Sequence, residues 1–238
     1  MRPRVSIIVP THDRPHLLPR ALASLEGQSS SDWQAIVVVN NPDAAVRRAY
    51  ASLLSGYLAD ERFELALSPR AGLGLALNLG LAFARGEFVA VLEDDDEWDP
   101  PFLESLVGEL DPFAGPLVYC DQRERLGDEP VNWVVPPPAE RQDYSRLFGG
   151  NWIAFPMALV RRAELLVIGG FDESCGGATD WDTWLRLAAR GPFRHARQTL
   201  VTHHWQKDRS NYCLDESAMA RANARIAEKR RAGAYRYS

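Results

Sequence analysis

The sequence feature that constrains this chain most is an apolar segment that ends in a run of acids. Residues 88–92 read Phe-Val-Ala-Val-Leu, and residues 93–96, which follow at once, are all acidic. A continuous apolar run of this length predicts a strand buried on both faces, as the strands of a parallel sheet are. Four adjacent carboxylates repel one another, so they are stable either as a solvated turn or around a divalent cation that takes oxygen ligands.

The composition excludes several classes of protein. The chain has 238 residues, enough for one large domain or two small ones, and 46% of them are hydrophobic. A net charge of −5 argues against a dedicated nucleic-acid-binding protein. Three scattered cysteines are expected to be reduced thiols, and no apolar run approaches the ~20 residues that span a bilayer. We therefore expect a cytoplasmic protein without a transmembrane segment.

The first 115 residues alternate between strand and helix patterns. Strands are predicted near residues 5–9, 35–39, 63–67 and 88–92, with helical spacing of apolar residues after each of them. Such alternation predicts an α/β fold with a mostly parallel sheet and helices on both faces. Ligands of such sheets bind at the carboxyl ends of the strands. Residues 11–14, 40–41 and 93–96 all lie at that edge.

The second part of the chain has a different pattern. Residues 121–150 are polar and then proline-rich, and we expect a loop or lid over the site. Residues 181–188 predict a helix, with Thr179 and Asp182 spaced as a capping box, which places Asp180 at the start of this helix. The basic tail, residues 211–238, is expected to be a solvated helix, and contact with anionic lipid is the alternative.

Four segments in this order resemble the family 2 glycosyltransferases, which are inverting enzymes with the glycosyltransferase A-type fold. They are residues 5–14, 38–43, 78–100 and 169–186. The resemblance implies one Rossmann-like domain over residues 1–238. Its nucleotide-sugar-binding half would be residues 1–115, its acceptor-binding and catalytic-base half residues 116–210, and its helical tail residues 211–238.

The resemblance also implies the reaction. A single sugar would move from a nucleotide-diphosphate sugar to a hydroxyl of an acceptor, which could be a glycan, a lipid-linked sugar or a small molecule. The Gln-x-x-Arg-Trp motif and the membrane helices of the processive synthases are absent from the sequence. A Mn²⁺ or Mg²⁺ ion would neutralise the leaving diphosphate, and a general base would take the proton of the acceptor.

Roles follow residue by residue from the resemblance. Asp180 would be the catalytic base, and Asp95, Asp96 and His204 would bind the metal, with His203 as the alternative histidine. The nucleotide would contact a set of polar residues at the strand ends: Pro10, Thr11, Asp13, Asn40, Asn41, Asn78 and Asp94. The sugar or acceptor would contact Trp98, Trp181 and Asp182, although a core role for Trp181 and a capping role for Asp182 are the structural alternatives.

The sequence departs from the family pattern at three places. Asn40 or Asn41 stands where an acid commonly binds uracil, but an amide oxygen can still accept that hydrogen bond. UDP is therefore the favoured nucleotide, with dTDP and GDP as alternatives. Leu77 replaces an arginine and Thr179 replaces a glutamate. Arg209 and Ser210 are expected to close over the phosphates.

Three rival functions are compatible with parts of the sequence. The first is a catalytically degenerate nucleotide-binding protein or interaction module on the same fold. A dehydrogenase is suggested by Gly72-Leu73-Gly74, but the third glycine of that motif is missing. A nucleotidyltransferase would need a glycine-rich loop where residues 10–13 read Pro-Thr-His-Asp.

Overall fold

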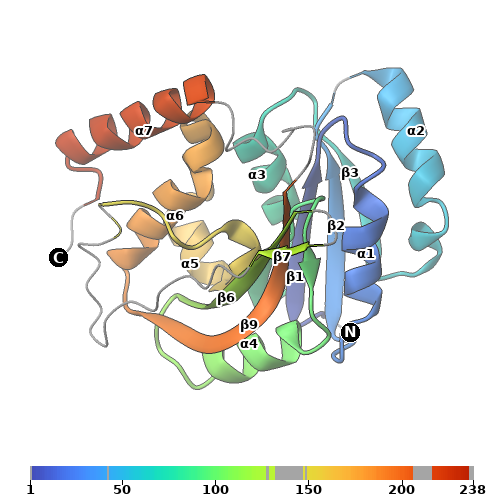
Figure 1. Cartoon of the computed structure of the whole chain (residues 1–238), viewed down its shortest axis with the longest axis horizontal. Coiled ribbons are helices and arrows are strands. Elements are labelled where there is room, and N and C mark those ends of the chain that lie inside the picture. The colour runs from blue at the N-terminus through green and yellow to red at the C-terminus, as the bar shows by residue number, and fades with distance from the viewer. Residues whose placement is uncertain are drawn as a thin grey trace.

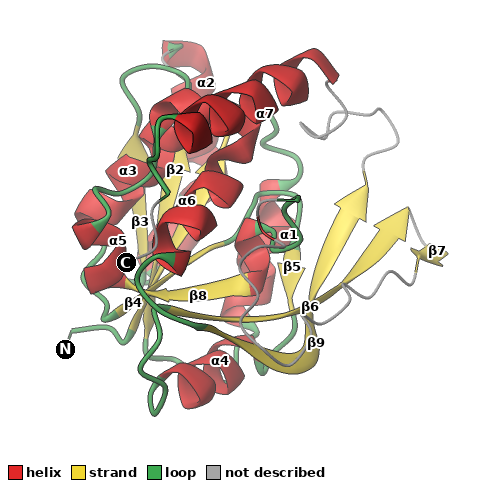
Figure 2. Ribbon diagram, turned by 90° about the vertical axis from the view of Figure 1, so that its left-hand side faces the viewer, coloured by secondary structure: helices red, strands yellow, loops and turns green. Residues whose placement is uncertain are grey.

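The structure is a computed structural model that describes residues 2–41, 43–126, 129–131, 147, 149–205 and 216–235. Within these residues, one nine-stranded mixed sheet runs through the molecule, with helices packed on both of its faces (Figures 1 and 2). The strand order is β3-β2-β1-β4-β8-β6-β9-β5, and β7 pairs with the outer part of β6. The predicted α/β class is confirmed.

The N-terminal half contains the predicted alternation of strands and helices. All three strand pairs within it are parallel. The elements are β1 (Val5–Thr11), α1 (Leu18–Glu26), β2 (Trp33–Val39), α2 (Ala44–Leu54), η1 (Tyr57–Ala59), β3 (Phe63–Leu67), α3 (Leu73–Phe83) and β4 (Phe88–Val91). Every residue of β1, β2 and β4 is buried, as the continuous apolar runs predict.

The C-terminal half extends the sheet with mixed pairing. Strand β8 runs antiparallel to both β4 and β6, whereas β6 and β9 are parallel. The elements are β5 (Glu97–Trp98), α4 (Phe102–Leu110), β6 (Leu117–Leu126), β7 (Glu129–Val131), η3 (Phe155–Met157), β8 (Ala158–Arg161), α5 (Arg162–Val167), η4 (Glu173–Ala178), α6 (Thr179–Ala188), β9 (Phe193–Trp205) and α7 (Glu216–Arg231).

Part of the predicted lid is a strand instead. Residues 121–126 continue β6 and pair along β9, so the expectation of a loop over 121–150 was wrong for this part. The sequence does not predict this strand, because its side chains are largely polar. The strand is defined by backbone pairing with β9 and not by an apolar face. Residues 132–146 lie outside the described residues. Among those described, none of the helices has the length and apolarity that crossing a bilayer requires.

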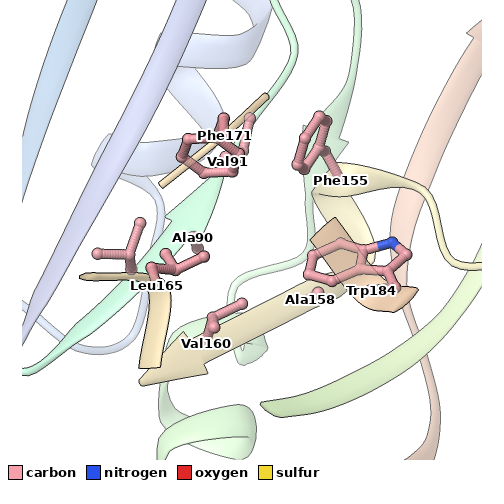
Figure 3. Close-up of a pocket in the computed structure, with 9 residues that line it drawn as sticks. Ala90, Val91, Phe155, Ala158, Val160, Leu165, Phe171 and Trp184 are labelled. Atoms are coloured by element: carbon pink, nitrogen blue, oxygen red, sulfur yellow. The ribbon is translucent and has the colours of Figure 1, made fainter. Parts of the chain in front are cut away.

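A small apolar cavity lies between strands β4 and β8 and the helices packed on them (Figure 3). A water-sized sphere can reach about 10 Å³ of it, which is at the lower limit for one water molecule. All its lining side chains are apolar: Val89, Ala90, Val91, Phe155, Ala158, Val160, Leu165, Phe171 and Trp184. The cavity is therefore part of the dry core and offers a polar ligand nothing to bind.

Helix α3 packs unusually close to the sheet. A Cβ atom at Gly80 would collide with the side chain of Ile8 on β1, and Ile8 is fully buried. By contrast, a Cβ atom at Gly108, on the exposed side of α4, would meet nothing within 4 Å. The small residues of α3 thus fix the distance between this helix and the strands that carry the site.

These two glycines provide a matched test of the packing. Gly80→Ala is expected to lower the free energy of unfolding by about 1–3 kcal/mol, because Ile8 or the helix must move. Gly108→Ala is expected to raise it by about 0.5–1 kcal/mol, because alanine loses less backbone entropy in a helix. Urea denaturation measures both, and equal effects of the two substitutions would contradict the packing described.

Candidate active site

The acidic run forms a buried turn between β4 and β5. The backbone N–H of Asp96 donates to the carbonyl of Glu93 at 3.2 Å. Asp94, Asp95 and Asp96 are 0%, 5% and 1% exposed, respectively, whereas Glu93 is half-buried. A solvated acidic turn is therefore excluded. The protein must compensate these charges with its own groups or with a ligand.

Asp94 is compensated by the loop that follows β1. The Thr11 hydroxyl donates to Asp94 Oδ2 at 2.7 Å, and Arg14 pairs with both Asp94 and Asp95, reaching Asp95 Oδ2 at 2.8 Å. Burial raises the pKa of Asp94 to about 6, although Arg14 and Thr11 oppose that rise. Asp94 has no exposed surface, and its partners Thr11 and Arg14 belong to the protein, so its contact with the nucleotide stays a prediction.

The loop of residues 11–14 is itself held by helix α2. Tyr50, fully buried on α2, accepts the backbone N–H of Arg14 at 3.0 Å and lies 2.9 Å from the Thr11 hydroxyl oxygen. Because Thr11 gives its proton to Asp94, Tyr50 donates to Thr11. Asp13 in the same loop has a positive φ of 55°. A chain of hydrogen bonds therefore runs from α2 through the loop to the acidic turn.

The predicted nucleotide residues of β1 and β2 meet at one edge of the sheet. Asn41 donates its amide to Asp13 Oδ1 at 2.5 Å. Asn40 is 7% exposed, and its amide oxygen accepts the N–H of Gly72 at 2.9 Å. Of the two asparagines, Asn41 is therefore the one at the surface of the cleft. Pro10 and Thr11 are both buried within β1.

Asn78 belongs to the scaffold. Its amide nitrogen donates to the carbonyl of Phe171 and its amide oxygen accepts the N–H of Phe171, both at 2.8 Å. This pair of bonds joins α3 to the loop before η4. Both ends of the amide are engaged by the backbone of Phe171, and the contact of Asn78 with the nucleotide stays a prediction.

Two histidines at the end of β9 contact the acids, and their roles differ. His203 Nδ1 lies 2.9 Å from Asp96 Oδ1, while His204 Nε2 lies 2.6 Å from Glu97 Oε1. Burial lowers the pKa of His203, but Asp96 and its neighbours outweigh that effect and raise it to about 9. The pKa of His204 is lowered, mainly by burial. The imidazole that faces the acidic turn is thus that of His203, the alternative to the predicted His204.

Glu93 differs from Asp94, Asp95 and Asp96, because His203 offsets its negative charge only at a distance. Within the described part of the chain, no group forms a hydrogen bond or ion pair with its carboxylate. Burial raises its pKa well above the usual range, and the negative charges of Asp96, Asp95 and Asp180 raise it further. Asp180 is therefore near enough to the acidic turn to act electrostatically on Glu93.

Asp180 lies in the first turn of α6 and is half-buried. Asn151 donates its amide to Asp180 Oδ2 at 2.6 Å, and the N–H of Trp181 donates to Oδ1 at 2.7 Å. Desolvation raises the pKa of Asp180 to about 7 despite these two bonds. A carboxyl with such a pKa is suited to accept a proton near neutral pH.

Three other predicted features lie in the core. Trp98 is 3% exposed, stacks on Phe102 and donates its indole N–H to the carbonyl of Pro156, so it does not reach a sugar. Asp182 is fully buried and paired with basic residues. The capping box is also absent, since the Thr179 hydroxyl donates to the carbonyl of Gly176.

Trp181 is half-buried and donates its indole N–H to the carbonyl of Leu147 at 2.6 Å.

Several residues of the site were missed in the sequence. No sequence motif points to Arg14, Tyr50 or Asn151. For Glu93, the sequence does not show that its carboxylate has no bonded partner among the described residues. Arg14 had a usable signal, because it is a cation three residues beyond a strand that pairs with the acid-ended strand. Arg209 and Ser210 lie outside the described residues.

The fold is that of the glycosyltransferases with an A-type fold. Two solved structures share the fold, each with a TM-score of 0.69. The mannosyltransferase PcManGT from Pyrobaculum calidifontis, in complex with GDP-Man and Mn²⁺, is 22% identical over 96% of this chain and 65% of its own. TarS residues 1–349 of S. aureus, in complex with UDP-GlcNAc, are 17% identical over 86% of this chain and 59% of their own.

The sequence model of glycosyl transferase family 2 matches residues 6–166, and the chain belongs to that family. A chondroitin synthase of Escherichia coli is 25% identical over 203 residues, which are 81% of this chain and 28% of that protein. The chain spans less than two thirds of the length of each of these three relatives.

Arg14 gives the first test of this site. Arg14→Met is expected to lower the free energy of unfolding by on the order of 3 kcal/mol, because it leaves buried Asp94 without its cationic partner. Arg70→Met removes an ion pair whose arginine is 67% exposed, so a loss below about 1 kcal/mol is expected. Chemical denaturation of both variants measures the difference, and a loss for Arg14→Met no larger than that for Arg70→Met would contradict the account.

Proposed function

We propose that this chain is a metal-dependent, inverting transferase that moves one sugar from a UDP-sugar to a hydroxyl of an acceptor. The observation that carries the proposal is that two chemically different acid groups lie near one another. The turn of residues 93–96 gathers negative charge against Arg14 and His203, and Asp180, which acts electrostatically on Glu93, has a pKa of about 7. One side would hold the leaving diphosphate and the other the attacking hydroxyl.

The acidic turn fits a divalent cation. Its donors are carboxylate oxygens and an imidazole, which Mn²⁺ and Mg²⁺ accept as ligands. Arg14 and His203 pair with Asp95 and Asp96, whereas among the described residues no group bonds to the carboxylate of Glu93 and His203 acts on it only electrostatically. Asp95, Asp96 and Glu93 would hold the ion, with His203 beside them. The ion would neutralise the charge that grows on the departing diphosphate.

The nucleotide would lie across the ends of β1 and β2. Asn41 and Asp13 are the polar side chains at the surface there and would contact the base, while Asn40 would shape the pocket through its bond to Gly72. The two solved relatives were bound to UDP-GlcNAc and GDP-Man, so both bases are known on this fold. We assign UDP to this chain because an asparagine can both donate to and accept from uracil.

Asp180 would be the general base. Its carboxylate is fixed by Asn151 and by the N–H of Trp181, and it would take the proton of the acceptor hydroxyl as that oxygen attacks the anomeric carbon. Attack from the side of Asp180, opposite the diphosphate, inverts the configuration at that carbon. Trp181, next to the base, would contact the acceptor or the sugar.

Binding and turnover can be tested separately. A panel of UDP-, GDP- and dTDP-sugars is screened with Mn²⁺ or EDTA by thermal shift, and the best donor is then assayed for transfer and for hydrolysis by water. Asp180→Asn is expected to reduce turnover by at least about 10²-fold and to leave Mn²⁺-dependent UDP binding unchanged. Asp111→Asn, at the opposite edge of the sheet beside Arg4, is the control and is expected to change neither.

Two outcomes would contradict this function. UDP binding without any turnover in the unaltered chain would indicate a degenerate nucleotide-binding protein. Undiminished turnover in Asp180→Asn would show that another group is the base.

The base also predicts a pH dependence. A carboxyl with a raised pKa is protonated below that value, so kcat/KM should rise with pH up to about 7 and then level off. The hydrogen bond from Asn151 stabilises the charged form of Asp180, so Asn151→Ala should move this rise to higher pH. A pH profile of the two proteins measures the shift, and a shift to lower pH would contradict the assignment.

A further inference from the structure

Helix α6 is attached to the C-terminal helix by a buried group of charges. Asp182, two residues after Asp180, is fully buried and pairs with Lys229 of α7. Lys229 also bonds to Asp172 Oδ2 at 2.7 Å, and the Tyr235 hydroxyl donates to Asp182 Oδ1 at 2.7 Å. Arg186 pairs with the other oxygen of Asp182 at 2.7 Å. Two carboxylates thus meet two cations, and the group is neutral as a whole.

The ammonium group of Lys229 occupies a position where a metal ion could otherwise bind. The ligand atoms of Asp172, Cys175 and Asp182 lie within 4.8 Å of one another, a spacing that a metal ion could use. The Lys229 ammonium bonds to both carboxylates of this set, and its side chain is only 11% exposed. Although burial raises the pKa of Asp172, the bond from Lys229 holds it well below its usual range.

Helix α7 is packed on the segment that leads into α6. Ala222 and Ile226 on α7 and the following Tyr235 are each at most 6% exposed. Arg225 bonds to Ser174 in η4 at 3.0 Å. Both ribbon views show α7 beside α6 (Figures 1 and 2). The C-terminal helix is therefore part of the folded catalytic half and not the solvated tail that its composition predicts.

The first turn of α6 depends on these contacts. Its N-cap residue, Ala178, has no side chain that could bond to the free N–H groups of the helix. Residues two apart in a helix point in different directions. Asp182 accordingly reaches α7 while Asp180 reaches Asn151 on the cleft side. A shift of the Asp182 anchor would rotate the first turn and carry Asp180 with it.

We propose that Lys229, assisted by Tyr235, is a positioning residue for sugar transfer: through Asp182 it fixes the first turn of α6 and so aims Asp180 at the acceptor hydroxyl. This inference rests on the proposed role of Asp180 as the base. It concerns the catalytic step alone, because none of these residues contacts the nucleotide edge of β1 and β2. A displacement of about 1 Å at a reacting group can reduce the rate about 10²-fold.

The test separates catalysis from binding. Lys229→Met and Tyr235→Phe are compared with Arg225→Met, which removes a cation from the same helix that bonds to Ser174 and Glu228 instead of Asp182. We measure kcat and KM for hydrolysis of the best UDP-sugar, and the Kd for UDP with Mn²⁺. Lys229→Met is expected to lower kcat at least about 10-fold with KM and Kd unchanged, Tyr235→Phe to lower it less, and Arg225→Met to leave it unchanged.

Tyr235→Phe keeps the test informative where Lys229→Met fails to fold, because it removes only the hydroxyl that bonds to Asp182. An unchanged kcat in Tyr235→Phe and in any folded Lys229→Met overturns the inference, as does an equal loss in Arg225→Met. Loss of UDP binding in step with kcat indicates general destabilisation and also overturns it. An inactive unaltered chain refutes the proposed function instead.

Hydrogen exchange gives a readout that needs no substrate. In Lys229→Met or Tyr235→Phe, amides of residues 176–184 are expected to exchange faster, while those of β1 and β4 keep their rates. Uniform acceleration across the chain, or none in residues 176–184, would overturn the positioning role.

Discussion

The repulsion among four neighbouring acids at the end of β4 is the constraint on which the site depends. Burial makes this repulsion stronger, since little water remains to screen it. Arg14 and Thr11 bond to Asp94 on one side of the turn, and His203 pairs with Asp96 on the other side. These partners come from β1 and β9, which flank the turn from opposite parts of the chain. Arg14, Thr11 and His203 thus offset part of the negative charge of this turn.

The parallel half and the antiparallel half of the sheet position different parts of the site. The parallel half brings the carboxyl ends of β1, β2 and β4 to one edge, where polar loops meet. The antiparallel step at β8 then returns the chain, so that α6 comes to face this edge with Asp180 in its first turn. Asn78 joins the halves through the backbone of Phe171.

The parts of this structure that the sequence could predict are those with a period or a continuous apolar run. Strands β1, β2 and β4 and the helices between them have such patterns, and so does the acid-ended turn. The polar extension of β6 and the docking of α7 do not, because each depends on a distant partner. The roles of individual side chains were also difficult to predict, because they too depend on partners that are distant in the sequence. Trp98, Asp182 and Asn78 have residue types that bind sugars and nucleotides, and only their burial and bonding show that they support the fold.

In the proposed function a divalent cation and a nucleotide diphosphate meet at the acidic turn, opposite Asp180. Anomalous diffraction from crystals grown with Mn²⁺ and UDP would locate both ligands. We expect one strong manganese peak beside the carboxylates of Asp95 and Asp96, with the diphosphate between this peak and Asp180. A peak between Asp172 and Asp182, or UDP bound at this edge without any peak, would contradict it.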